Sequence, residues 1–280
     1  IEDVWKEEIK RKNIKLKIKE NDPACIIYTS GTSGVPKGVI LTHKAIRCNL
    51  IGSLDIFRNI NFSNEKYISF LPLSHSYEHT AGQFMPLLTS SQIFYAENMD
   101  KLFTNFKEVN PTYIAAVPRF YEAIYKKILN NFSKNKILEK LFSFNLKLGK
   151  KIYLNQKKFL VLTRFFKFFF KIIFDNKIKK VFGNELKFLI SGGGALSYDI
   201  NLFFESVGIK ILQGYGLTET SPTVSCNRPE FNKIGTVGPP IKGVKVKIAS
   251  DGEILIKGDT LMKGYLGKEK ETKEKIKNNW

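Results

Sequence analysis

Short apolar runs alternate along the chain with stretches in which apolar residues recur every three or four positions. The runs have the length of buried strands, and the stretches between them have the period of amphipathic helices. The expected strands are Ala24–Tyr28, Val39–Leu41, Tyr67–Leu73, Gln92–Ala96, Tyr113–Val117, Lys187–Ser191 and Ile209–Gln213. The expected helices are Thr42–Phe57, Ser74–Leu88, Met99–Val109, Arg119–Leu129 and Leu196–Val207. This alternation predicts an α/β fold with mainly parallel sheets flanked by helices.

A Lys- and Phe-rich segment, residues 130–182, interrupts the alternation with a long helical pattern. Within it, residues 158–174 are the most hydrophobic part of the chain, but their uncharged runs fall far short of the roughly 18 residues that a spanning helix needs. Arg164, Lys167 and Lys171 lie at helical spacing, so one narrow face is basic. The pattern indicates either one member of a buried helix pair or a helix lying in a membrane interface.

From Ile234 onward the pattern becomes that of β structure. Val244–Ile248 and Glu253–Lys257 alternate in polarity and flank an Asp-Gly turn, as in a β-hairpin. We therefore expect an α/β region over residues 1–233 and the beginning of a small β subdomain over residues 234–280.

Composition adds few restrictions. The 280 residues are 43% hydrophobic, enough for a large core in one or two domains. Cys25, Cys48 and Cys226 are too few and too scattered for a disulfide framework or a metal site, which favours a reducing, cytoplasmic compartment.

The net charge of +19 arises from 45 Lys and Arg against 26 Asp and Glu. Only six of the basic residues are arginine, the residue on which nucleic-acid readers depend most. We therefore expect no nucleic-acid partner, whereas attraction to anionic lipid or to a polyanionic substrate fits the charge.

The first candidate for chemistry is the stretch Tyr28–Gly38, Tyr-Thr-Ser-Gly-Thr-Ser-Gly-Val-Pro-Lys-Gly, between the first two expected strands. Glycines let backbone N–H groups approach an anion, hydroxyls add donors and lysine adds a mobile charge, so the stretch predicts a phosphate site. It differs from the common P-loop because Pro36 precedes Lys37 and apolar residues follow Gly38, so Lys37 should begin a strand. The alternative is a flexible Ser/Gly surface loop.

The second candidate is Gly214–Pro222, Gly-Tyr-Gly-Leu-Thr-Glu-Thr-Ser-Pro. Tyr215 could stack on a base, Thr218 could contact a phosphate and Glu219 could offer an oxygen to Mg²⁺. The alternative is a helix N-terminus with a capping Thr and an acidic first turn. Gly192–Gly194 also follows an expected strand, and ligands of open α/β sheets bind at the carboxyl ends of strands, so both glycine turns should line one crevice.

The stretch from Tyr28 to Val39 closely resembles the phosphate-loop signature of the adenylate-forming enzymes, which include the acyl-CoA synthetases. Gly214–Pro222 resembles a second signature of that family, and three weaker matches occur in the expected order, at Leu71–Glu78, Ser191–Leu196 and Gly252–Gly258 with Gly264-Tyr265 beyond. Ala195 stands where the family usually has proline. The five motifs make the chain most similar to bacterial long-chain fatty-acid–CoA ligases.

The resemblance implies ATP- and Mg²⁺-dependent activation of a long-chain fatty acid to acyl-AMP and then, with CoA as co-substrate, to acyl-CoA. Residues 1–233 would then bind nucleotide and acyl chain, and residues 158–174 could contact the inner face of a membrane to take up the fatty acid. Within the enzyme class, an acyl carrier protein could replace CoA, or the product could stop at acyl-AMP. A non-catalytic nucleotide- or lipid-binding module is the alternative from another class.

The same resemblance assigns roles to residues. The catalytic set would be Lys37, Thr218, Glu219 and His75, with His75 near the acyl carboxylate, and Thr29 and Glu219 would hold Mg²⁺. The nucleotide-binding set would be Thr29, Ser30, Gly31, Thr32, Ser33, Gly34, Lys37, Gly193, Gly194, Ala195, Gly214, Tyr215, Gly216 and Thr218.

The family also has a ribose-binding Asp in a motif that would follow Trp280, and a C-terminal domain that carries the adenylation lysine. We therefore expect the chain to be a fragment that lacks an N-terminal part and the C-terminal domain, with little or no activity alone.

Overall fold

The computed structural model describes residues 17–29, 35–154 and 181–280. The loop residues Ser30–Gly34 and the predicted helix 158–174 lie outside the described residues, so their predicted roles stay predictions.

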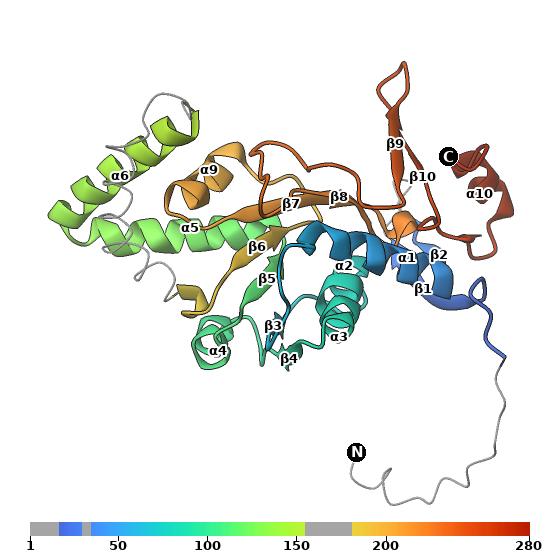
Figure 1. Ribbon diagram of the computed structural model, residues 1–280, viewed down its shortest axis with the longest axis horizontal. Coiled ribbons are helices and arrows are strands. Elements are labelled where there is room, and N and C mark those ends of the chain that lie inside the picture. Colours follow the sequence, from blue (N-terminus) through green and yellow to red (C-terminus); the bar gives the residue numbers. More distant parts are fainter. Residues whose placement is uncertain (1–16, 30–34, 155–180) are drawn as a thin grey trace, which may run out of the picture.

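A six-stranded, mostly parallel sheet forms the centre of the molecule (Figure 1). Its order is β4-β3-β5-β6-β7-β8, and every neighbouring pair is parallel except β7 with β8. The strands are β3 (Lys66–Ser69), β4 (Gln92–Tyr95), β5 (Tyr113–Ala116), β6 (Phe188–Ser191), β7 (Ile211–Gly216) and β8 (Thr223–Cys226). This arrangement confirms the α/β fold class that the sequence predicts.

Helices cover both faces of the main sheet. On one face, α4 (Leu102–Val109), α5 (Pro118–Ser133) and α9 (Tyr198–Ser206) pack on Ile114, Ala116 and Leu189, and α6 (Lys136–Leu154) packs against α5 and α9. On the other face, η1 (Asp55–Phe57), α2 (Ser76–Glu78) and the π-helical η2 (His79–Phe84) pack on Tyr113, Ala115 and Phe188. Side chains alternate between the two faces of a strand, which is why β5 and β6 supply both cores.

A second, antiparallel sheet contains β1 (Pro23–Thr29), β2 (Lys37–Thr42) and β11 (Gly264–Tyr265). Thr29 and Lys37 are opposite each other in the register, and Lys37 begins β2 as predicted. The Thr42 hydroxyl accepts a hydrogen bond from the amide of Ala45 and caps α1 (His43–Leu54), also as predicted. α3 (Met85–Leu88) packs beside α1.

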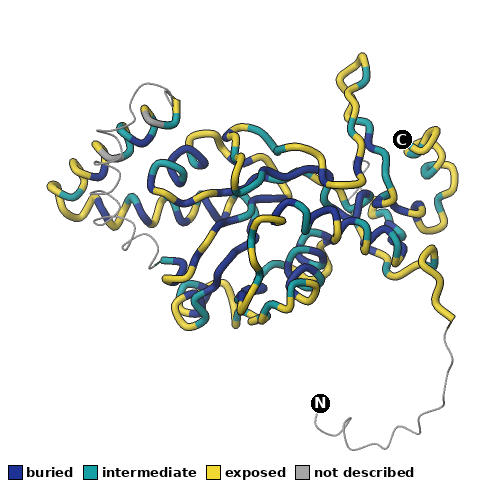
Figure 2. The backbone as a smooth tube through the Cα atoms, in the orientation of Figure 1, coloured by how far each residue is buried: buried dark blue, intermediate teal, exposed yellow. Residues whose placement is uncertain are grey.

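β9 (Lys245–Ile248) and β10 (Ile254–Lys257) form the predicted antiparallel hairpin, which projects from the end of the molecule opposite α5 and α6 (Figure 1). α10 (Glu269–Lys275) follows β11. In Figure 2 the hairpin tip and α10 are mostly exposed, whereas the strands of the main sheet are mostly buried. None of the described helices is both long and apolar enough to cross a membrane.

The structure corrects several expected boundaries. β3 ends at Ser69 and not at Leu73, because the restricted Leu71-Pro72 pair and a following turn end the extended run. The helix expected over 74–88 is divided into α2, η2 and α3 by a π-helical stretch. The helices expected at Met99 and Leu196 begin instead at Leu102 and Tyr198.

The most informative correction concerns β7. The sequence predicts a strand that ends at Gln213 and a glycine turn after it, but the strand continues through Gly216. Gly214, Tyr215 and Gly216 pair with Cys226, Ser225 and Thr223 of β8, a strand that the sequence analysis missed. The backbone pairing with β8 therefore fixes this motif, which was predicted to be a loop.

Candidate functional site

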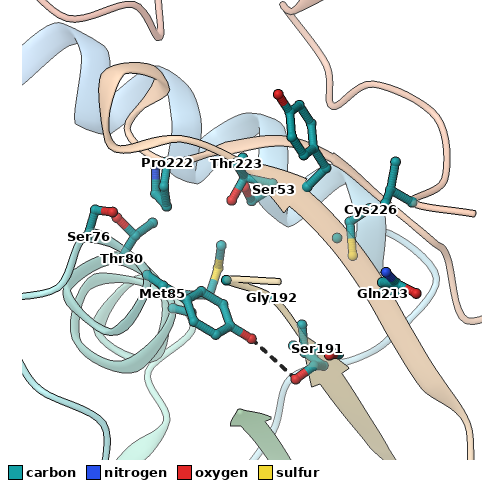
Figure 3. Close-up of a pocket in the computed structure, with 18 of the residues that line it drawn as sticks. Ser53, Ser76, Thr80, Met85, Ser191, Gly192, Gln213, Pro222, Thr223 and Cys226 are labelled. Carbon is teal, nitrogen blue, oxygen red and sulfur yellow. Dashed lines mark hydrogen bonds between the residues drawn. The ribbon is translucent and has the colours of Figure 1, made fainter. Parts of the chain in front are cut away.

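A cavity of about 600 Å³ lies between the main sheet and the helices α1, α2, η2 and α3. In Figure 3, Ser76, Thr80 and Met85 lie on its helical side, across from Gln213 and Cys226. The cavity lies on the same face of the sheet as Tyr113 and Phe188. It therefore extends along the strands from their carboxyl ends toward their amino ends.

The carboxyl-end mouth of the cavity collects most of the described residues that the sequence analysis singled out. Both predicted glycine-rich segments contribute to one cavity, Gly192–Gly194 directly after β6 and Gly214–Gly216 as the last residues of β7. The predicted site residues that line it are Thr29, His75, Gly193, Gly194, Ala195, Gly214, Tyr215, Gly216, Thr218 and Glu219.

Glycine is required where the chain passes closest to the helices. A Cβ atom on Gly192 would lie 2.9 Å from Cζ of Tyr77, too close for any other residue without movement. The next residue, Gly193, has a φ of +74°, in the left-handed region that side chains with a Cβ disfavour. The turn after β6 can therefore run directly beside the cavity.

Lys37 does not line the cavity, but it contacts two residues of the C-terminal segment, one of which links it to the cavity rim. Its ammonium lies 2.5 Å from Oε2 of Glu271 and 5.2 Å from the ring centre of Tyr265. The Tyr265 hydroxyl donates a 2.8 Å hydrogen bond to Oε1 of Glu219. Tyr265 thus connects the two charged residues that the sequence assigns to phosphate and Mg²⁺.

These contacts change the ionisation of the C-terminal residues. The hydrogen bond from Lys37, helped by Lys268, lowers the pKa of Glu271. Burial and the neighbouring Glu219 carboxylate raise the pKa of Tyr265, so its hydroxyl remains a donor. The sequence analysis quoted Tyr265 only as part of a β signature and missed Glu271, for which the sequence gives no local signal.

Two hydroxyl groups from opposite sides of the mouth contact each other. The Ser76 and Thr218 hydroxyl oxygens are 3.1 Å apart and join the start of α2 to the turn after β7. His75 is exposed beside them, and its Nδ1 accepts a hydrogen bond from the amide of Tyr77. Nε2 of the His75 ring can therefore act as a donor toward a ligand.

The turn that carries Thr218 and Glu219 is η4 (Thr218–Thr220), and a buried side chain of α1 holds it. Asn49 is fully buried, and its Nδ2 donates to the carbonyl oxygens of Thr220 at 3.0 Å and Thr223 at 2.7 Å. The sequence analysis missed Asn49, because nothing along α1 marks a partner about 170 residues away.

Buried polar groups at the mouth remain available to a ligand. Ser191 and Gln213 both line the cavity. Neither Ser191 Oγ nor Gln213 Oε1 has a hydrogen-bond partner among the described residues. Burial raises the pKa of the Cys226 thiol to about 12, so this cavity residue stays neutral near pH 7.

Toward the amino ends of the strands the lining becomes aromatic. Phe57, Phe62, Tyr113 and Phe188 all line the cavity there. Phe57 and Phe188 stack with ring centres 5.1 Å apart. The cavity therefore combines a polar, partly charged mouth with an apolar interior, an arrangement that suits a ligand with one anionic and one hydrocarbon end.

The donor set at the mouth fits Mg²⁺ bound together with phosphate. In the described ranges no three His, Cys, Asp or Glu side chains come together as a metal cage. Mg²⁺ commonly uses one or two carboxylates and takes its other ligands from phosphates and water. Glu219 and the Thr29 hydroxyl, which line the same mouth, are of the right chemistry for such a shared site.

The chain is similar in sequence to curated acyl-CoA synthetases. The chain is 34% identical over 272 residues to long chain acyl-CoA synthetase 7, peroxisomal, of Arabidopsis thaliana, covering 91% of this chain and 38% of that protein. It is 32% identical over 293 residues to long chain acyl-CoA synthetase 5 of the same plant, covering 96% and 43%. The chain thus spans less than half the length of these curated relatives.

Solved structures share the fold. O-succinylbenzoate coenzyme A synthetase from Bacillus subtilis, in complex with ATP and magnesium ion, matches with a TM-score of 0.68 and 19% identity, covering 100% of this chain and 50% of that one. Apo MatB from Rhodopseudomonas palustris matches with a TM-score of 0.66 and 20% identity, covering 94% and 44%. The sequence model of the AMP-binding enzyme family matches residues 2–266, and the chain belongs to that family.

Proposed function

We propose that this chain supplies the ATP- and acyl-binding part of an AMP-forming long-chain fatty-acid–CoA ligase. The observation that carries the proposal is that one cavity combines a polar mouth, where residues predicted to bind phosphate lie, with an aromatic interior. The names of the curated relatives support the same substrate class.

The reaction would have two steps. A carboxylate oxygen of the fatty acid attacks the α-phosphorus of ATP, and pyrophosphate leaves with the electron pair of the broken P–O bond. The CoA thiol, losing its proton to solvent, then attacks the acyl carbonyl and AMP leaves. In both steps the protein contributes mainly by holding the reacting groups in line and by offsetting charge.

The residues at the mouth suit these tasks. Lys37 would neutralise the β- and γ-phosphates after it exchanges Glu271 for them, Thr218 would donate to the α-phosphate, and His75 would orient the acyl carboxylate. Tyr215 lines the cavity where a purine could stack on its ring. Mg²⁺ between Glu219 and the phosphates, when bound, would supply further charge neutralisation.

The test is ATP–pyrophosphate exchange with palmitate and Mg²⁺, measured on this chain and on a longer version extended at both ends. We expect exchange in the longer version, a loss of about 100-fold or more on Lys37→Ala or Glu219→Ala, and little change on Lys101→Ala. Lys101 is a matched control, because its exposed ion pair with Glu97 is remote from the cavity. An extended protein that catalyses no exchange with any fatty acid would overturn the proposal.

A further inference from the structure

The four aromatic residues that line the amino-end part of the cavity form a closed cycle of ring contacts. The distances between neighbouring ring centres are 5.9 Å for Phe57 and Phe62, 6.5 Å for Phe62 and Tyr113, 5.9 Å for Tyr113 and Phe188, and 5.1 Å for Phe188 and Phe57. Two of these contacts are stacked and two are edge-on. Such a cycle leaves each ring fixed by two others, so the cluster resists displacement.

We call this cluster of four residues the aromatic wall. The main sheet shows where it lies relative to the mouth. Tyr113 and Phe188 are paired in register at the first positions of β5 and β6, whereas Ser191 ends β6 at the mouth. Phe188 and Ser191 are three residue steps apart along an extended strand, a distance of about 10 Å. The aromatic wall therefore lies at the end of the cavity opposite the polar groups.

The four rings differ from ordinary core aromatics in facing the cavity. Tyr67, whose ring centre is only 5.3 Å from that of Tyr113, is fully buried and does not line the cavity. Each member of the aromatic wall does line it. A hydrocarbon chain entering from the mouth would thus meet these aromatic side chains at the far end.

We propose that the aromatic wall ends the acyl site and sets the longest hydrocarbon chain that the protein accepts, an inference that rests on the proposed function. Each methylene that reaches the apolar interior gains about fourfold in affinity. A methylene beyond the wall must either displace a packed ring or fold back, and neither gives that gain. Affinity should therefore rise with chain length and then stop rising at a definite length.

Phe62 is the member that can be changed with least damage to the fold. It is only partly buried and lies between η1 and β3, outside any helix or strand, whereas Phe57 and Phe188 are buried and stacked on each other. Phe62→Ala would lengthen the cavity, and Phe62→Trp would shorten it. Phe103→Ala is the matched control, because Phe103 is also partly buried but packs on the opposite face of the sheet.

The experiment uses calorimetry to measure how saturated fatty acids bind to the version extended at both ends. Acids of about eight to eighteen carbons are compared, because each added methylene should raise the affinity by a similar factor until the limit is reached. In the unsubstituted extended protein we expect affinity to rise with length to a limit. Phe62→Ala should move that limit to acids longer by about two carbons or more, Phe62→Trp should move it to shorter acids, and Phe103→Ala should leave it unchanged.

Two results would overturn the inference, and they differ in what else they overturn. If the extended protein binds fatty acids but folded Phe62→Ala and Phe62→Trp variants keep the original limit, the aromatic wall does not set the length, and the proposed function stands. If the unsubstituted extended protein binds no fatty acid of any length, the proposed function fails as well. Should Phe62→Ala not fold, Phe62→Trp and the conservative Phe62→Leu decide the question.

Discussion

Asn49 is the residue on which the geometry of the turn after β7 most depends. Asn49 lies on α1, and its side-chain amide donates hydrogen bonds to the carbonyl oxygens of Thr220 and Thr223. No other side chain of the described residues donates to these two oxygens. Asn49→Ala leaves one buried and one partly buried acceptor without this donor, so we expect the free energy of unfolding to fall by about 2–4 kcal/mol. Urea denaturation followed by circular dichroism measures this loss.

Because the same turn presents Thr218 and Glu219, Asn49→Ala should also weaken MgATP binding by about tenfold or more. Asn59→Ala is the control, since Asn59 is exposed and bonds only to Glu230 on the surface. That variant should stay within about 0.5 kcal/mol of the parent. Equal stability of the two variants would show that the turn holds its shape without Asn49.

Glu78 is a buried carboxylate beside the mouth, bonded by the hydroxyls of Ser69 at 2.6 Å and Tyr67 at 3.0 Å. Burial raises its pKa above the ordinary value of 4.5, and the two hydroxyls offset this only in part. A raised pKa means that the folded state holds the proton more tightly than the unfolded state. The stabilisation from Glu78 is therefore complete below pH 4.5 and declines as the pH rises through the folded pKa.

Glu78→Gln keeps the shape of the side chain and does not titrate. We expect the stability of the parent relative to this variant to decrease between pH 4 and pH 7, a window that begins at the ordinary glutamate pKa of about 4.3–4.5. Chemical denaturation at several pH values measures the difference. Glu97→Gln should give a change of opposite sign and at lower pH, because the hydrogen bond from Lys101 lowers the pKa of Glu97, so that the stabilisation is present above pH 4.5 and is lost as the pH falls through the folded pKa. A flat or rising difference for Glu78→Gln would contradict this account.

At the scale of elements, the segment β11–α10 contacts the candidate phosphate site through two side chains. Its Tyr265 bonds Glu219 and its Glu271 pairs with Lys37, so ATP must displace a carboxylate to reach the lysine. Both side chains of the Lys37–Glu271 pair are partly exposed, which limits its strength. Glu271→Gln should therefore raise MgATP affinity by about two- to fivefold, measured by calorimetry.

Glu274→Gln tests whether the effect is specific to the contact. Glu274 lies on the same helix and is exposed, so its substitution removes the same charge without releasing Lys37. We expect it to change MgATP affinity much less than Glu271→Gln does. Equal effects of the two variants would mean that only the net charge of α10 matters.

The elements also show what the sequence could and could not predict. Local signals predicted the strands β1 and β2, Lys37 at the start of β2, the Thr42 cap and the β9–β10 turn, because each depends on residues next to one another. The extension of β7 through Gly216 depends on pairing with β8, and the glycines by themselves favour a turn. The π-helical stretch at His79–Phe84 was missed for the same reason, since its position follows from packing and not from period.

Some residues of the candidate site could likewise be predicted from local motifs, and others could not. Thr29, Thr218, Glu219 and the two glycine-rich segments could be found because their motifs are contiguous in sequence, and the structure brings them to one cavity. Asn49, Glu271 and the aromatic wall could not, because each acts through a partner distant along the chain. Their roles follow only from the three-dimensional arrangement.

At the scale of the whole molecule, burial is concentrated in the middle of the main sheet. Every residue of β5 is buried, and β6 is nearly so, because helices cover both of their faces. The β9–β10 hairpin has a single buried residue, and α10 has none (Figure 2). Local opening needs less free energy where fewer apolar contacts are lost.

Native-state hydrogen exchange should therefore resolve three levels of protection. Amides of β5 and β6 should exchange slowest, near the rate set by global unfolding, amides of the edge strand β4 faster, and amides of β9, β10 and α10 fastest. Addition of MgATP should slow exchange at the turn Thr218–Thr220 but leave β9–β10 unchanged, because only the turn lines the cavity. Protection of the hairpin equal to that of β5 would contradict this order and would place the hairpin within the cooperative core.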